Sequence, residues 1–281
     1  MAERTGGVVI NADSAQLYRD LPILSAAPAA ADLMCAEHRL YGVLDGAEGW
    51  GAGHWARMAR RQVEEAHAGG KLPILVGGSG LYLRTLLDGI APIPTIDPQI
   101  RAEVRASDVA ANHAKLAEHD PAAAARLNPA DTLRVARALE VVVSTQRTLA
   151  DWQSHRTGGI AGAVELRPLV LLPTRDWLYA RCDERFASMM EHGAIDEVQA
   201  LLDRKLDPSL PVMRAIGVRE IAALLTGTTD RDECIARGQQ ATRNYAKRQY
   251  TWFAHQPPAD WPRFAETLDI AAALELLEPS A

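Results

Sequence analysis

The stretch VVINADSAQLY, residues 8–18, decides the fold class of this chain. Its first four residues, Val8–Asn11, have the apolar character of a buried strand, and Asp13, Ser14 and Gln16 follow at once. In open α/β sheets, ligands bind just beyond the carboxyl ends of the strands. A carboxylate there can act as a general base, a metal ligand or a ribose acceptor. Asp and Ser also cap helices, and position alone leaves both interpretations of Asp13 open.

A second α/β unit follows along the chain. Residues 54–68 have the apolar spacing of a helix, and Pro73–Val76 is a short apolar run bounded by breakers. The sequence GGSG at 77–80 then turns the chain into a helix over 81–87. This order is typical of a parallel sheet. Glycines before a helix N-terminus admit an anionic ligand, although a plain tight turn explains GGSG equally well.

The composition changes in the middle of the chain. Proline-rich segments near 91–98 are typical of a domain exit, and residues 100–153 are helical in pattern, with no strand. A strand over 166–172 and helices over 176–206, 213–225 and 230–253 complete the pattern. We therefore predict an α/β core of residues 1–94 and 164–281, interrupted by a helical insertion at 95–163.

Overall composition limits the function classes. The net charge of −6 over 281 residues argues against indiscriminate nucleic-acid binding but permits a local basic groove. Cys35, Cys182 and Cys234 are scattered, which favours reduced thiols in a cytoplasmic protein. No run of about 20 apolar residues occurs, so we expect no membrane span. A monomer is the default expectation.

Basic residues gather in three segments. Arg134 and Arg137 share a helical face with Glu140, which suits a phosphate backbone or simple intrahelical ion pairs. Two more arginines flank Ile216 and Gly217 in MRAIGVRE, and a further group lies in TRNYAKRQYTW near Tyr245 and Trp252. Guanidinium groups bind phosphate oxygens in pairs, so these segments predict a pyrophosphate or RNA site. A basic surface helix is the alternative.

These segments together resemble the tRNA dimethylallyltransferase (isopentenyltransferase) family. The resemblance rests on DSAQLY, PILVGGSGLYL, DPAAAARLNPAD with RALEV, MRAIGVRE and TRNYAKRQYTWF, in the family's order. It implies a P-loop-NTPase-like parallel sheet and transfer of a dimethylallyl group from dimethylallyl diphosphate to N6 of adenosine 37 in tRNA. It also implies Mg²⁺ as a cofactor and a helical insertion that contacts the anticodon stem-loop.

The resemblance assigns roles to individual residues. Asp13 is implied as the general base and Arg219 as a catalytic cation. Ser79, where the family usually has Thr, is implied as a hydrogen-bonding partner of the target base or of nearby backbone. Arg219, Arg243 and Lys247 are implied as pyrophosphate-binding, and no metal ligand is assigned. The implied tRNA-binding residues are Asp13, Ser14, Ala15, Gln16, Ser79, Arg101, Leu133, Arg134, Val135, Ala136, Arg137, Arg214, Ala215, Ile216, Gly217, Val218 and Arg219.

The chain departs from the family in one respect. The family begins with a strand and a phosphate loop of the form GPTASGKS, whereas no G-x-x-x-x-G-K-[ST] occurs here. We therefore expect a first strand and phosphate loop, roughly thirty residues, to be missing. Ala27 also replaces a lysine that the family often carries. Two other functions stay open: an inactive tRNA-binding remnant and a small-molecule kinase of the phosphate-loop type.

Overall fold

The computed structural model describes residues 1–265 and 270–277, and the chain divides into two compact units. The first contains residues 1–85 and 163–281, and the second contains residues 86–162. The second unit begins at Leu86, nine residues before the insertion boundary predicted at 95, and ends at Gly162. The chain leaves the first unit within a helix, α4 (Gly80–Asp88), and not at the proline-rich segment that suggested the boundary.

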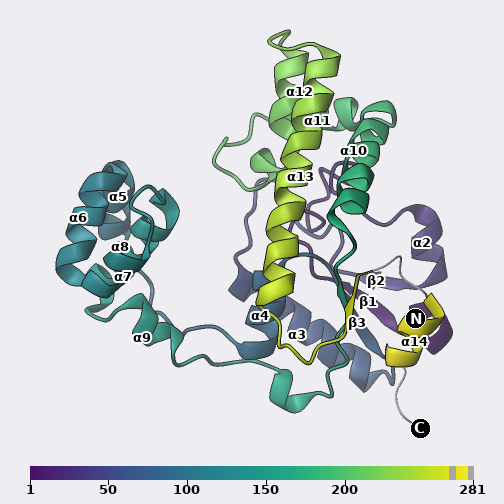
Figure 1. Ribbon diagram of the computed structural model, residues 1–281, viewed down its shortest axis with the longest axis horizontal. Helices are drawn as coiled ribbons and strands as arrows, with labels where there is room; N and C mark the ends of the chain where they lie inside the picture. The colour runs from purple at the N-terminus through teal and green to yellow at the C-terminus, as the bar shows by residue number, and fades with distance from the viewer. Residues whose placement is uncertain (266–269, 278–281) are drawn as a thin grey trace. The chain divides into compact units, whose positions relative to one another are not determined.

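A parallel sheet with strand order β2-β1-β3 organises the first unit (Figure 1). Strand β1 (Val8–Asn11) lies between β2 (Glu37–Arg39) and β3 (Pro73–Val76). Val8 aligns with Glu37 on one side and with Pro73 on the other. β1 and β3 have the predicted bounds, whereas β2 was not predicted, because EHR carries no apolar signal of its own.

Helices alternate with these strands along the chain. α3 (Ala52–Ala68) buries Trp55, Ala59, Val63 and Ala66, which recur at helical spacing, and it packs against β1 and β3. α4 follows β3 directly. The short helices α1 (Ala2–Thr5) and α2 (Ala30–Cys35) occupy the loops around β1 and β2.

The rest of the first unit is mainly helical. α10 (Arg175–Glu191) packs against the long α13 (Arg231–His255), and α11 (Ala194–Asp203), η2 (Val212–Arg214) and α12 (Val218–Leu225) lie between them in sequence. β4 (Val170–Leu171) pairs in parallel with β5 (Arg263–Phe264), and α14 (Ile270–Leu277) follows. The strand predicted over 166–172 is thus only two residues long. Gly193, at φ 103°, breaks the helix predicted over 176–206 into α10 and α11.

The second unit is a helical bundle whose starts are set by capping. It contains α5 (Pro98–Ala106), α6 (Val109–His119), α7 (Pro121–Arg126), α8 (Thr132–Thr145) and α9 (Leu149–Gln153). Each begins after a residue whose side chain accepts a backbone N–H, which satisfies an otherwise unpaired donor: Asp97, Asp108, Asp120, Asp131 and Thr148. Leu116, Val135 and Leu139 are fully buried at its centre. Among the helices that the structure describes, none has both the length and the apolar character needed to cross a membrane.

Candidate active site

Asp13 lies one residue beyond Ala12 at the carboxyl end of β1, and a buried asparagine fixes its backbone. The Asn11 side chain accepts a hydrogen bond from the Asp13 backbone N–H at 2.7 Å and donates to the Asp13 carbonyl at 3.0 Å. It also donates to the Leu40 carbonyl at 2.9 Å, and Asn11 is 0% exposed. The Trp55 indole N–H donates to the Asn11 carbonyl at 3.0 Å. These four bonds hold Asp13 at the edge of the sheet.

The Asp13 carboxyl combines burial with local hydrogen bonding. Burial raises its pKa, whereas hydrogen bonds from the backbone N–H groups of Ala15 and Gln16 and the charge of Arg185 act in the opposite direction. The Ala15 N–H donates to Oδ1 at 2.8 Å. Among the residues that the structure describes, no Lys or Arg forms a salt bridge with Asp13. The result is a carboxylate held by peptide dipoles, with a basicity above that of an exposed aspartate.

The GGSG turn packs against protein and not around an anion. A Cβ on Gly77 would lie 2.2 Å from the Ala12 carbonyl carbon, and one on Gly80 would lie 2.4 Å from the Trp252 ring. The Gln249 amide fills the position that a Cβ on Gly78 would take, and it donates to the Gly78 carbonyl at 3.0 Å. The glycines therefore let the β3 turn approach both the Asp13 loop and α13 closely. This favours the tight-turn interpretation of GGSG over a phosphate cradle.

Ser79 joins this turn to the Asp13 loop. Its hydroxyl accepts a hydrogen bond from the Ser14 backbone N–H at 3.0 Å and lies 3.3 Å from the Ser14 hydroxyl. The Ser79 backbone N–H donates to the Ala12 carbonyl at 3.1 Å. Ser79 thus binds the residue that follows Asp13 and links the ends of two neighbouring strands.

Three phenols respond to the charge of the Asp13 carboxylate. Burial, followed by nearby charges that include Asp13, raises the pKa of Tyr41 and of Tyr82 to about 12. The pKa of Tyr245 is also raised, first by burial and then by Asp13, while hydrogen bonds to Gln249 and Ser79 oppose the rise. All three phenols keep their protons at neutral pH. The charge of Asp13 is therefore felt by three neutral phenols.

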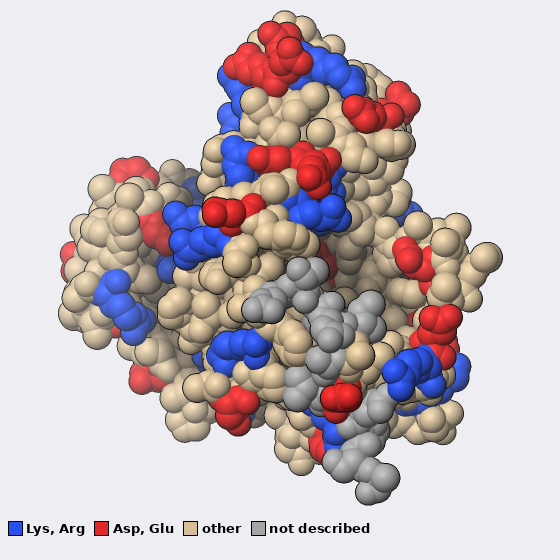
Figure 2. Space-filling view, turned by 45° about the vertical axis from the view of Figure 1, so that its right-hand side comes forward, with Lys and Arg blue, Asp and Glu red and all other residues tan. Residues whose placement is uncertain are grey.

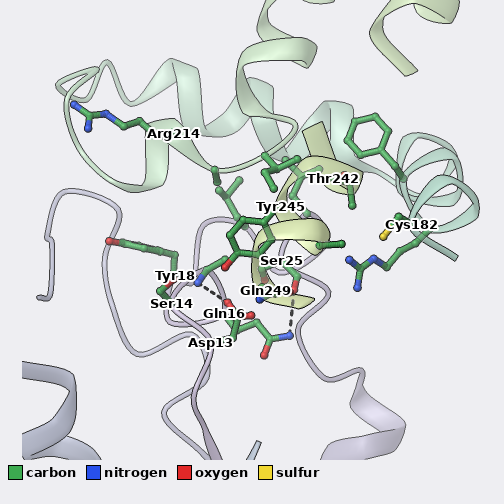
Figure 3. A pocket seen from close by; sticks show the side chains of 18 of the residues that line it. Asp13, Ser14, Gln16, Tyr18, Ser25, Cys182, Arg214, Thr242, Tyr245 and Gln249 are labelled. Carbon is green, nitrogen blue, oxygen red and sulfur yellow. Dashed lines mark hydrogen bonds between the residues drawn. The ribbon is translucent and has the colours of Figure 1, made fainter. Parts of the chain in front are cut away.

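A cavity of about 710 Å³ has Asp13, Tyr82 and Tyr245 in its lining, whereas Tyr41 does not line it. Figure 3 shows Asp13, Ser14, Tyr245 and Gln249 gathered together, with Cys182 farther off and the Arg214 side chain extending away from Asp13. The Gln16 amide donates to the Ser25 and Ala26 carbonyls at 3.1 and 2.7 Å. These bonds connect the loop that carries Asp13 to the segment around Ser25, which also lines the cavity. The apolar part of the lining comes from Leu21, Leu24, Leu178, Phe186, Met189 and Ile216.

The arginines of the cavity differ in part from those predicted. Arg185, Arg214 and Arg248 line it. In the described residues, Arg219, Arg243 and Lys247 do not: Arg219 is exposed on α12, Lys247 is exposed on α13, and Arg243 is paired with Asp183 of α10. Arg248 lines the cavity because helical spacing puts it on the same face of α13 as Tyr245 and Gln249. Position 243 lies on a different face, toward α10.

The predicted segment 214–219 is divided between cavity and core. Arg214, Ala215 and Ile216 line the cavity, whereas Gly217 and Val218 are buried. Gly217 has φ 96°, and a Cβ there would lie 2.8 Å from Leu24. This glycine therefore shapes the rim of the cavity and leaves no side chain to bind a ligand.

The other predicted tRNA-binding residues belong to the helical unit. Leu133 and Arg134 are 77% exposed. Val135 is 0% exposed and Ala136 is buried, so both side chains pack in the core of the unit and present no contact surface to RNA. Arg101 and Arg137 are about half exposed and both lie near Glu140.

Sequence reasoning missed Tyr82, Arg185 and Gln249 as residues of the site. Each comes from a segment in which it reads as an ordinary helix residue: α4, α10 and α13. The conjunction of Tyr245, Arg248 and Gln249 on one helix face was the only available signal. The packing of α13 against the turn after β3 decides which residues this helix face contacts.

Charge on the face of the molecule that Figure 2 shows is mixed and not concentrated. Figure 2 shows Lys and Arg side chains interspersed with Asp and Glu over the face in view. A binding site for a polyanion on such a surface has to come from local clusters of arginine.

Comparison with known proteins identifies the family. A family model described as IPP transferase matches residues 16–256. The chain is 64% identical over 264 residues to the tRNA dimethylallyltransferase of Sphingopyxis alaskensis, covering 94% of this chain and 86% of that protein. It is 57% identical over 272 residues to the tRNA dimethylallyltransferase of Novosphingobium aromaticivorans, covering 96% and 97%.

A solved structure agrees with these relatives. The tRNA isopentenylpyrophosphate transferase of Bacillus halodurans matches with a TM-score of 0.68 and 32% identity, over 98% of this chain and 86% of that one. The parallel α/β sheet is therefore the fold of this family. The alignments extend over most of each relative, so the expectation that a first strand and phosphate loop are missing finds no support in them.

Proposed function

This chain belongs to the tRNA dimethylallyltransferase family, and we propose that it transfers a dimethylallyl group from dimethylallyl diphosphate to N6 of adenosine 37 in tRNA. The observation that carries the mechanism is Asp13, a carboxyl whose pKa burial raises and which lines a cavity with both an apolar wall and arginines. A P-loop-NTPase-like arrangement of the sheet is part of this proposal, supported by the parallel order β2-β1-β3.

The chemical step needs a base, because the lone pair of the adenine amine is delocalised into the ring. The N6–C1 bond forms as the bond between C1 and the diphosphate oxygen breaks, and the diphosphate leaves with that electron pair. The N6 proton passes to the Asp13 carboxylate. A positioned general base typically contributes about 10²–10⁴-fold to the rate.

The neighbours of Asp13 suit this role. Burial of the carboxyl raises its pKa, and the peptide N–H groups of Ala15 and Gln16 hold its orientation. Gln249 lines the cavity and offers an amide with which a flipped base would hydrogen-bond, and Ser79 holds the backbone of Ser14, which also lines it. The apolar lining from Leu24, Phe186 and Met189 matches a five-carbon prenyl chain.

The diphosphate requires cations. Arg185, Arg214 and Arg248 line the cavity, so we place the diphosphate among them in preference to Arg219, Arg243 and Lys247. The Arg243–Asp183 pair would have to open before Arg243 could bind a phosphate oxygen. Arg219 and Lys247 keep the weaker role of attracting the anion from the surface.

Mg²⁺ is implied by the family, but the described residues do not provide a site that fits it. They contain no group of three or more His, Cys, Asp or Glu side chains placed to hold a metal ion. Asp13 is the one carboxylate of the cavity lining within the described residues, and peptide N–H groups already occupy it. We therefore derive no step through the metal.

The helical unit supplies the remaining part of the proposal, which is contact with the anticodon stem-loop. RNA stems are recognised largely through shape and phosphates, and the half-exposed arginines of α5 and α8 suit that role. We propose that the protein acts as a monomer in the cytoplasm. Its described cysteines Cys35, Cys182 and Cys234 are all unpaired, which agrees with a reducing compartment.

Product analysis tests the proposal directly. The chain is incubated with unmodified tRNA and dimethylallyl diphosphate in Mg²⁺ buffer, and digested nucleosides are examined by mass spectrometry for prenylated adenosine. We expect product from the wild-type chain and a loss of about 10²–10⁴-fold in Asp13→Ala, with tRNA affinity largely retained. Asp203→Ala, at an exposed aspartate of α11, is the matched control and should match the wild type.

The outcomes separate the alternative functions. Salt-sensitive tRNA binding without any product would favour the inactive binding protein. Transfer of phosphate to a small molecule would favour the kinase. Wild-type turnover in Asp13→Ala would overturn the role given to this carboxylate.

A further inference from the structure

A buried carboxylate lies at the centre of an arginine cluster in the helical unit. Glu140 of α8 has a side chain that is 1% exposed. Arg105 of α5 donates from Nε to its Oε1 at 2.9 Å, and Arg101 Nε and Arg137 Nη1 lie 3.8 Å from Oε2. Arg101 and Arg105 are one turn apart on α5, and Arg137 is three residues before Glu140 on α8. One carboxylate therefore organises arginines from two helices.

The charges in this cluster are unbalanced. Three guanidinium groups share one carboxylate, which leaves an excess of positive charge. Burial lowers the pKa of Arg137, and the charges of Arg101 and Arg105 lower it further, while Glu140 opposes them. The three cations are thus close enough to repel one another. Glu140 offsets that repulsion, and without it the arginines would be free to separate.

The arginines remain available to a ligand. The side chains of Arg101, Arg105 and Arg137 are 46%, 66% and 42% exposed. Each guanidinium carries five N–H donors, and the shared carboxylate has only two oxygens to accept them. The carboxylate therefore leaves most of these donors available to a ligand. Fixed guanidinium donors with excess positive charge suit a phosphodiester backbone.

We propose that Glu140 is a positioning residue that holds Arg101, Arg105 and Arg137 as one phosphate-binding cluster, and that Arg105 contacts tRNA together with the other two. The proposal rests on the proposed function, because it takes tRNA as the ligand of the helical unit. Such a cluster differs from a set of surface cations that bind independently of one another. Arg134, which is 77% exposed and paired with its own helix cap Asp131 at 3.5 Å, is such an independent cation.

The Glu140→Gln variant tests the proposal, because the two explanations predict opposite signs. If the arginines act only by their charge, removal of a carboxylate should strengthen RNA binding. If Glu140 positions them, tRNA affinity should fall about three- to tenfold, and the slope of log affinity against log salt should become shallower. Affinity is measured by titration of fluorescent tRNA into the full chain, below the onset of thermal unfolding of each variant.

A second variant keeps the test valid if Glu140→Gln unfolds the helical unit. Arg105→Gln removes a largely exposed side chain, and we expect a similar loss of affinity and a salt slope reduced by about one. Arg126→Gln, at an exposed arginine of α7 outside the cluster, is the matched control and should change affinity less than twofold.

The possible results are distinct. Unchanged or tighter binding by folded Glu140→Gln, or wild-type affinity in Arg105→Gln, would overturn the cluster. Failure of the wild-type chain to bind tRNA at all would instead overturn the proposed function.

Discussion

Asp13 of the α/β unit and Glu140 of the helical unit are both carboxylates withdrawn from water, and their surroundings differ. Asp13 faces a cavity, is held by peptide N–H groups and has phenols as neighbours. Glu140 faces the interior of its unit and has Arg101, Arg105 and Arg137 as neighbours. Burial raises the pKa of Asp13 and makes it a stronger base, whereas Glu140 is the shared partner of three guanidinium groups. The first arrangement suits proton transfer and the second suits the organisation of charge.

Charge removal at these two sites should have opposite effects on stability. The raised pKa of Asp13 means that its charge destabilises the fold at neutral pH, so Asp13→Asn should raise the free energy of unfolding by about 0.5–2 kcal/mol. Its turnover should nevertheless fall about 10²–10⁴-fold. Glu140→Gln should lower the free energy of unfolding by about 1–3 kcal/mol, because three neighbouring guanidinium groups lose the carboxylate that offsets their repulsion.

Thermal or urea unfolding at pH 7 measures both changes. The stabilisation in Asp13→Asn should vanish at acid pH below the ordinary aspartate pKa, where the native residue is protonated in both states. Destabilisation by Asp13→Asn at pH 7 would contradict the contrast between the two carboxylates.

Gly77→Ala tests whether the site depends on close packing of the β3 turn. The added Cβ would lie 2.2 Å from the Ala12 carbonyl carbon and 2.6 Å from the Asp13 nitrogen, both of which are backbone atoms that cannot rotate away. We expect a loss of about 1–3 kcal/mol in unfolding free energy and a large fall in turnover. At Gly69 the nearest atom is at 3.5 Å, so Gly69→Ala should stay within about 0.5 kcal/mol. Equal effects of the two variants would refute the packing argument.

Asn11→Ala tests the backbone clamp on Asp13. The change removes the acceptor for the Asp13 N–H and the donors to the Asp13 and Leu40 carbonyls, which should cost about 1–3 kcal/mol. Turnover should fall at unchanged tRNA affinity. Asn112→Ala removes a comparable buried amide, which donates to the Val104 carbonyl at 2.7 Å in the helical unit, and should leave turnover at saturating tRNA unaffected. A fall of kcat in Asn112→Ala and not in Asn11→Ala would reverse the assignment.

The smallest expected effect is a displaced pH profile. Turnover requires ionised Asp13, so it should fall as the pH drops through the raised pKa of that carboxyl. Arg185 lowers this pKa through its charge, so Arg185→Gln should move the acid limb of kcat to higher pH, measured at saturating substrates. Movement to lower pH would show that the charge of Arg185 does not act on Asp13.

Local patterns predicted the elements that carry their own signal. The apolar runs Val8–Asn11 and Pro73–Val76 became β1 and β3 with unchanged bounds, because both are apolar and flanked by breakers. β1 is mostly buried, whereas β3 is only partly buried and its Val76 is 48% exposed. Strand β2, with sequence EHR, could not be predicted, because only its pairing with β1 makes it a strand. The helix over 176–206 was predicted as continuous, since the positive φ of Gly193 is a property of the packed chain.

The sequence alone determined the parallel α/β class, the helical character of residues 100–153 and the position of Asp13 beyond the carboxyl end of a strand, because each follows from a local pattern of apolar residues and breakers. Tertiary structure alone decided which arginines surround the cavity, that Val135 is core and that Glu140 gathers three arginines. Helical spacing assigns a side chain to a face of its own helix. Only packing decides whether that face meets a cavity, another helix or water.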